Sequence, residues 1–215
     1  MHRFAALLGL AVVVFAGPVF AAEKSCKEEV LEAFTKQRTS KAFTMQAELK
    51  GEAGQVTINV EYIPPDRMRQ TIVAPGQRAP LETVLVGTRA WSRQGTVWKE
   101  LMPAVAQTII AQVRDAVMVP PKDVGEFECR GTETVDGKAY LAYRSVEKQT
   151  GAPKGSTITR PVHRTVYVDQ ETGLPAINIV AEDAPDAEPI FKGLYAYPTD
   201  LEIEGHPDAP LATIR

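Results

Sequence analysis

The fold is decided by residues 56–72, which read VTINVEYIPPDRMRQTI. Over residues 56–62, apolar side chains alternate strictly with polar ones. This period of two is typical of a strand with one apolar face and one polar face. Pro64 and Pro65 then interrupt the strand, and a second extended run begins at Arg67. The stretch therefore predicts a long antiparallel hairpin, and most of the chain repeats this unit.

The alternation continues on both sides of this hairpin. Short extended segments are separated by turns that contain Gly or Pro, at the spacing of β-hairpins. Beyond the hairpin itself, the segments cover residues 43–49, 81–86, 89–93, 97–101, 127–135, 139–146, 164–169, 174–180, 190–197 and 201–203. No crossover separates them, so we expect about ten or eleven strands in one large antiparallel sheet, which must curl to bury its apolar face.

Two segments have helical spacing instead. Ser25 and Glu28 have the spacing of a capping box, and the apolar residues that follow lie on one stripe of a helix over 26–38. A second helix is predicted over 104–118, with a wide apolar stripe. Two helices are few for so large a sheet. The sequence therefore predicts either a tight hydrophobic plug or a concave apolar gap beneath them.

The first residues indicate export. Residues 1–21 combine a weakly positive start, an apolar run and short residues before Ala21, which is typical of a cleaved secretory signal. The alternative is a membrane anchor, but the run is shorter than the roughly 20 apolar residues that span a bilayer. We expect a single mature domain over 22–204, soluble and periplasmic after cleavage, and a frayed C-terminal tail over 205–215.

The overall charge disfavours one class of partner. The chain carries 24 Lys and Arg residues against 27 Asp and Glu residues, a formal net charge of −3. A mildly acidic protein is poorly suited to holding phosphate backbones. Nucleic acid is therefore not an expected partner.

The two cysteines, Cys26 and Cys129, suggest a covalent link. In an oxidising compartment a single pair most simply forms a disulfide, here closing a loop of about 100 residues. The alternative is lipidation of Cys26. The preceding residues 23–25 are charged or polar where a lipoprotein signal has small apolar residues, so the disulfide is favoured.

No arrangement of residues predicts catalysis. His163 and His206 are far apart, and the sequence lacks the closely spaced His or Cys ligands of a zinc site. It also lacks a Gly-rich phosphate loop and a nucleophile elbow. The acidic residues over 182–188 indicate a solvated loop, because they do not form a complete calcium-ligand loop. We expect a protein that is not an enzyme and that needs no metal and no cofactor.

Two motifs resemble the LolA/LolB-like lipoprotein-carrier superfamily, which includes LppX-type mycobacterial lipoproteins and the lipid-sensing part of RseB. They are YIPPDRMR at 62–69, followed by a strand pair that ends in Trp98, and YVDQETGLP at 167–175. The order of signal, helix, strands, helix and strands also matches, so the resemblance covers most of residues 26–204. It implies an α+β, mostly antiparallel β fold: a large curved, unclosed half-barrel sheet of about 10–11 strands, with two covering helices as a lid and an apolar cavity for acyl chains. The lack of a lipidation motif argues against the membrane-anchored LolB and LppX types.

Candidate ligand-binding residues follow from this implied cavity. Trp91 and Trp98 are either sheet core or flat walls that contact acyl chains. The methionines leave the same choice, since flexible thioethers fill cores and also suit adaptable pockets. Arg67 and Arg69 either face solvent or lie at the cavity rim, where they would pair with a lipid head group or a lid carbonyl. The candidate cavity and rim residues are Met45, Met68, Trp91, Trp98, Ile109, Val113, Arg67 and Arg69.

The expected function is that of a periplasmic carrier or chaperone without enzymatic activity. It would bind a lipid, or the acyl chains of a lipidated protein, as a monomer, with a membrane-associated protein as donor or acceptor. The alternative is a regulatory or scaffold module that binds a protein partner through the same fold, at an exposed sheet edge. A lipid that co-purifies with the protein would favour the carrier, and a filled core without lipid would favour the scaffold.

Overall fold

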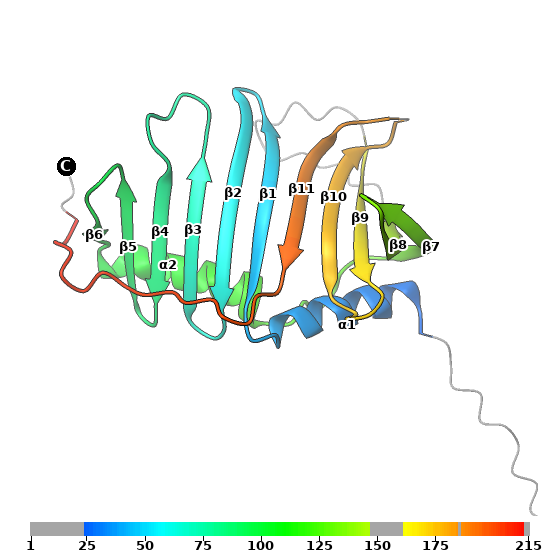
Figure 1. The fold of residues 1–215 in the computed structure, drawn as a ribbon, viewed down its shortest axis with the longest axis horizontal. Coiled ribbons are helices and arrows are strands. Elements are labelled where there is room, and N and C mark those ends of the chain that lie inside the picture. The colour runs from blue at the N-terminus through cyan, green and yellow to red at the C-terminus, as the bar shows by residue number, and fades with distance from the viewer. Residues whose placement is uncertain (1–23, 147–160, 185, 213–215) are drawn as a thin grey trace, which may run out of the picture.

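The fold is seen in a computed structural model of the 215-residue chain. The structure describes residues 24–146, 161–184 and 186–212 (Figure 1). The predicted signal, residues 1–21, lies outside the described residues. Within those three ranges, no helix is both long and apolar enough to cross a membrane.

One antiparallel sheet of eleven strands, which does not close, dominates the described chain. Its strands are β1 (Phe43–Gly51), β2 (Gly54–Ile63), β3 (Arg67–Val73), β4 (Leu81–Val86), β5 (Arg89–Gln94), β6 (Lys99–Glu100), β7 (Phe127–Val135), β8 (Lys138–Ser145), β9 (Val162–Asp169), β10 (Pro175–Glu182) and β11 (Pro189–Ala196). The order across the sheet is β6-β5-β4-β3-β2-β1-β11-β10-β9-β8-β7. Two meanders therefore meet where β1 pairs with β11 (Figure 1). The predicted fold class is confirmed, although residues 201–203 are not a strand.

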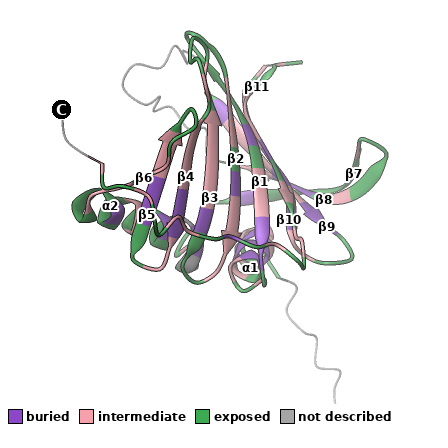
Figure 2. Cartoon of the chain, turned by 60° about the vertical axis from the view of Figure 1, so that its left-hand side comes forward, coloured by how far each residue is buried: buried purple, intermediate pink, exposed green. Residues whose placement is uncertain are grey.

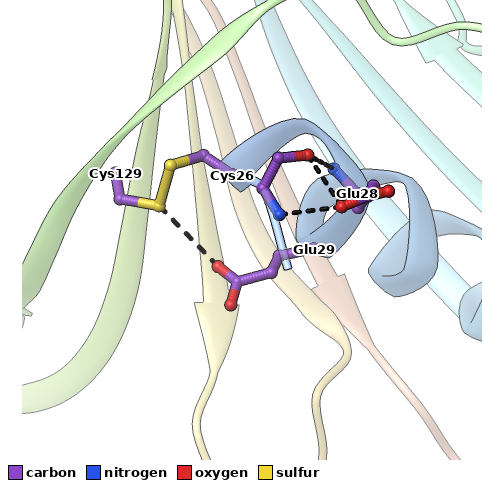
Figure 3. Close-up of a disulfide and its surroundings, with 5 residues drawn as sticks. Cys26, Glu28, Glu29 and Cys129 are labelled. Carbon is purple, nitrogen blue, oxygen red and sulfur yellow. Dashed lines mark hydrogen bonds between the residues drawn. A yellow bond between two sulfur atoms is a disulfide. The ribbon is translucent and has the colours of Figure 1, made fainter. Parts of the chain in front are cut away.

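The two predicted helices are present. α1 (Cys26–Arg38) has the predicted bounds and its capping box. The Glu28 amide donates to Ser25 Oγ at 3.3 Å, and the Ser25 amide donates to Glu28 Oε2 at 2.8 Å (Figure 3). α2 (Pro103–Val113) continues into one π-helical turn, η1 (Arg114–Met118). Together α2 and η1 cover the helix expected over 104–118.

Both helices pack on the same face of the sheet, which we call the inner face. Phe34 of α1 packs with Val166 of β9, and Val113 of α2 packs with Met68 of β3. The strand register places Val166 and Met68 on one side of the sheet. The last described residues, 197–212, cross the opposite, outer face of β1–β6 (Figure 1).

Hydrophobic clusters form on both faces of the sheet. Figure 2 shows the buried residues as purple segments of its strands. The inner face has two clusters of buried residues, one under α2 and one under α1. The first is Phe43, Val60, Met68, Leu85, Ala90, Ala106, Val113 and Val117; the second is Val30, Ala33, Phe34, Phe127, Tyr143, Val166 and Val168. The outer cluster consists of Val84, Trp91 and Ile203.

A disulfide ties the first residue of α1 to the edge strand β7. Cys26 and Cys129 are joined with an S–S distance of 2.06 Å, and their Cα atoms are 5.4 Å apart (Figure 3). The predicted pairing is therefore present. Because 103 positions separate the two residues, the bond links the start of the fold to its second half.

The C-terminal segment, which we define as residues 197–212, is held on the outer face by arginines of β3. Arg67 Nη1 donates to the Ile203 carbonyl at 2.9 Å, and Arg69 Nη2 donates to the Glu202 carbonyl at 3.3 Å. These bonds satisfy backbone groups that have no strand partner. The segment is thus part of the fold without being a strand.

The far end of this segment is also held. The Glu100 amide donates to the Pro210 carbonyl at 2.9 Å, and the Ala212 amide donates to the Glu100 carbonyl at 2.7 Å. The prediction that residues 205–215 fray is therefore wrong for 205–212. Prolines prevent a regular ladder there, but bonds to the short edge strand β6 and packing on the tryptophans replace it.

Candidate ligand-binding site

Two pockets lie on the inner face beneath the helices. The α1 pocket has a volume of about 260 Å³ and is lined by Phe34, Gln37, Arg38, Phe43, Met45, Tyr62, Val117, Pro121, Asp123, Val124, Arg164 and Tyr195. The α2 pocket has a volume of about 240 Å³ and is lined by Tyr62, Met68, Gln70, Thr83, Ile109, Gln112 and Val113. Tyr62 lines both pockets. Each pocket alone is slightly smaller than a typical small-molecule site of about 300–1,000 Å³.

The wall between the two pockets is aromatic. The Tyr62 ring lies 5.0 Å from the Phe43 ring, measured between centroids. Burial raises the pKa of the Tyr62 phenol to about 12. The side chain is therefore neutral at physiological pH, and its ring offers an apolar surface to either pocket.

The α1 pocket also contains a half-buried cation. Arg164, on β9, donates from Nε to Asn178 Oδ1 at 2.9 Å, and its guanidinium lies 4.9 Å from the centre of the Phe34 ring. Burial lowers the pKa of Arg164 from its ordinary value. Tyr195 lies in the same pocket, and burial raises the pKa of its phenol. The groups that contact the guanidinium directly, Asn178 and Phe34, are thus uncharged.

Charged groups at the mouth of the α1 pocket come from α1 and from the connection after η1. Asp123 accepts a hydrogen bond from the Gly125 amide at 3.0 Å and lies 3.1 Å from Lys27 Nζ. The Gly125 amide and Lys27 together lower the pKa of this carboxyl. Arg38 adds a second guanidinium, whose pKa burial also lowers.

Four of the residues predicted from the sequence come together on the inner face. Met45 lines the α1 pocket, and Met68, Ile109 and Val113 line the α2 pocket. Side chains alternate between the two faces along a strand, and Met45 on β1 and Met68 on β3 are at positions that point to the helix-covered face. Their contact with a ligand stays a prediction.

The two tryptophans lie on the outer face. Trp91 is 3% exposed and packs with Val84 and Ile203, and its indole Nε1–H has no partner in the described chain. Trp98 stacks on His206 with ring centroids 3.9 Å apart, beside a shallow hollow formed with residues 205–209. The interpretation of these indoles as walls of the helix-covered cavity is therefore wrong, because the register turns Trp91 toward the C-terminal segment and Trp98 stacks on His206 of that segment.

The predicted rim arginines also lie on the outer face. Arg67 and Arg69 donate to carbonyls of the C-terminal segment, and Arg69 also pairs with Glu61 at 2.8 Å. They alternate with the inward-facing Met68, so they cannot reach the inner pockets. The hypothesis that one of them pairs with a lipid head group or a lid carbonyl is wrong.

Sequence reasoning missed Arg164, a cation that lines the α1 pocket on the inner face. A signal was present: Arg164, Val166 and Val168 share one parity along β9, so the arginine stands where the period places an inward side chain. Phe34 and Tyr195 were missed for a different reason. Their meeting depends on the docking of α1 and on the β1–β11 pairing, which join distant segments.

What the site offers is binding: apolar walls, a neutral phenol and a guanidinium. In the part of the chain that the structure describes, no three His, Cys, Asp or Glu side chains are grouped as metal ligands.

The sequence matches no protein-family model, and no curated protein matches it significantly. The structure is similar to LprF of Mycobacterium bovis, with a TM-score of 0.54 and 9% identity over 84% of this chain and 96% of LprF. The lipoprotein LppX of Mycobacterium tuberculosis also gives a TM-score of 0.54, with 10% identity over 82% of this chain and 97% of LppX. This chain has the fold of LprF and LppX. The predicted resemblance is confirmed at the level of the fold, and at such low identity it shows the fold alone.

Proposed function

We propose that this protein is an exported, periplasmic carrier or chaperone without enzymatic activity. It holds a lipid, or the acyl chains of a lipidated protein, between the inner face and the helices. The observation that supports this is the pair of pockets beneath α1 and α2, which share the Tyr62 ring. Each buried methylene contributes about 0.8 kcal/mol, so a chain of ten contributes roughly 8 kcal/mol before the cost of ordering it.

Helix α2 acts as the lid in this proposal. It packs on the sheet through apolar residues such as Ala106 and Val113, and the side-chain hydrogen bond from Thr108 stays within the helix. A helix held by apolar packing can exchange part of that packing for an acyl chain, because dispersion contacts are not directional. The protein works as a monomer and exchanges cargo with membrane-associated donor or acceptor proteins.

Solvent extraction and mass spectrometry of the protein, purified from its own periplasm, test the carrier. An unrelated periplasmic protein purified in parallel is the control. We expect one lipid class at near-stoichiometric amount in the extract of this protein alone. N-terminal sequencing of the same sample checks cleavage after Ala21. An extract without lipid, together with no binding of a fluorescent fatty acid, would refute the proposal.

A pair of substitutions in α2 locates the binding. Ile109→Trp fills the α2 pocket without adding charge, so we expect at least tenfold weaker binding of a fluorescent fatty acid. Val105→Trp is the matched control, because Val105 lies one turn earlier on the same helix and is 43% exposed. Equal binding by both variants would place the acyl chain outside the α2 pocket.

The second candidate is a module that binds a protein partner through its sheet edge. β7 pairs only with β8 among the described strands, and most of its residues are exposed. Such an edge can accept an added strand, although Glu128 and Arg130 place charges along it, which natural sheets use to block pairing. A protein that carries no lipid but binds a partner, and loses it on Thr132→Pro, would favour this module.

A further inference from the structure

Arg164 is a feature that a purely apolar cavity does not need. The groups that contact its guanidinium, the Asn178 amide oxygen and the Phe34 ring, carry no net charge. Within the described residues, no carboxylate oxygen lies within 4.0 Å of its guanidinium. Burying a cation without a counter-ion is unfavourable, because protein dipoles replace only part of the lost hydration.

Arg164 is not the only charged residue that lines the α1 pocket. The carboxylate that lines it, Asp123, accepts from the Gly125 amide and lies 3.1 Å from Lys27, which also pairs with Glu126 at 2.7 Å. Arg38 lines the same pocket and adds a further positive charge. Although burial lowers the pKa of both arginines, an arginine side chain stays protonated at physiological pH. The described lining of the pocket thus carries two guanidinium groups and one carboxylate beside apolar walls.

The planar shape of the Arg164 guanidinium limits the chemical class of ligand that it can bind. A guanidinium is planar and matches a carboxylate or a phosphate with parallel N–H···O bonds, and such charge-assisted bonds are stronger where water is excluded. Arg164 Nε is already used by Asn178, which fixes the orientation of the plane. The apolar part of the ligand has a place to go, because Tyr62 lines both this pocket and the α2 pocket.

We propose that the α1 pocket binds the anionic head group, carboxylate or phosphate, of an amphiphile whose acyl chain extends past Tyr62 into the α2 pocket. This inference rests on the proposed function and adds the class of ligand and its direction in the cavity. The head group lies against Arg164, and the end of the chain lies near Ile109.

Titration calorimetry with delipidated protein tests the inference. The probes share a chain length and differ in the head: hexadecanoate, hexadecyl phosphate and neutral hexadecanol, each below its aggregation concentration. Acetate and inorganic phosphate are the probes without a chain. We expect both anionic amphiphiles to bind at least tenfold more tightly than hexadecanol, and acetate and inorganic phosphate to show no binding in the same range.

Two variants with the same change of charge assign the effect. Arg164→Met keeps the length of the side chain and removes the cation, so anionic amphiphiles should bind as weakly as hexadecanol, whose own affinity stays the same. Arg144→Met is the matched control, because Arg144 pairs with Thr165 in the register and therefore lies on the outer face, where it contacts Asp183. Arg164→Lys, which keeps the charge, should lose only part of the preference and serves if the Met variant does not fold.

The outcomes separate the two proposals. Equal affinity for hexadecanoate and hexadecanol in the wild-type protein would overturn the head-group inference and leave the carrier intact. An equal loss of anion preference in the Arg144 and Arg164 variants would also overturn the head-group inference. The preference would then come from the electrostatic field of the whole protein. Binding of inorganic phosphate as tight as that of hexadecyl phosphate would show a simple anion site. Binding of no probe that carries a chain would overturn the carrier itself.

Discussion

Replacing Gly205 with alanine should destabilise the protein by about 1–3 kcal/mol, the usual cost of overpacking. A Cβ at this position would lie 2.6 Å from Cη2 and 2.7 Å from Cζ3 of Trp91. The indole has little room to move, because it is 3% exposed and packs with Val84 and Ile203. The new Cβ would therefore clash where the C-terminal segment packs on the outer face, and the segment would have to move away from the sheet to remove the clash.

Urea and thermal unfolding measure this cost. For a protein of this size, 1 kcal/mol lowers the midpoint of thermal unfolding by about 2–4 °C. Trp91→Phe removes the part of the indole that the new Cβ would touch, so the double-mutant cycle should show a coupling free energy of at least about 1 kcal/mol. Additive effects, or a Gly205→Ala variant as stable as the wild type, would refute the described packing of the segment on Trp91.

Three further predictions concern stability. Replacing Cys26 and Cys129 with serine should lower the free energy of unfolding by up to about 5 kcal/mol, because the disulfide closes a loop of some 103 residues; unchanged urea midpoints would contradict this. Lys138 holds the pKa of Asp169 at about 2, below its ordinary 3.8, so the stabilisation by this carboxylate is complete above about pH 4 and is lost as the pH falls toward 2. Asp169→Asn should flatten the loss of thermal stability in that window, and an unchanged acid profile would show that the ion pair contributes nothing. Arg67→Leu should cost about 1–2 kcal/mol and speed proteolytic cleavage in the C-terminal segment, as followed by mass spectrometry; cleavage at the wild-type rate would show that the bond to the segment is dispensable.

The strands could be predicted because their causes are local. The alternation over 56–62 predicts a strand with one solvent-facing side, and the capping box at Ser25 predicts the start of α1. The motif at 167–175 also has a local cause: the Asp169 carboxylate accepts from both the amide and the hydroxyl of Thr172, and Gly173 adopts a φ of +63°. That motif is a tight turn between β9 and β10, so it predicts fold and says nothing of a ligand.

The site could be predicted only in part, because the helices cover one face of the sheet and the C-terminal segment covers the other. Alternation places Met68 and Arg69 on opposite faces, but it does not say which face the helices cover. Both faces of β3 are covered, by α2 on one side and by the C-terminal segment on the other. The segment contains prolines and short polar runs, so its sequence shows no periodic pattern that would predict its packing. The burial of Ile203 also depends on contacts with Trp91, which is far away in the sequence.

This double covering separates stability from binding. An apolar pocket weakens a fold because the atoms that line it lack partners, so the compensating contacts must lie elsewhere. Here they lie on the outer face, around Trp91, and in the disulfide at the start of α1. Under the proposed function, an acyl chain would displace part of the packing of α2 while the sheet stays held from its other side. Gly205→Ala should therefore lower stability and leave the preference for anionic amphiphiles unchanged, whereas Arg164→Met should abolish that preference in a protein that still unfolds cooperatively. A change in ligand preference on Gly205→Ala would show that the two faces are coupled.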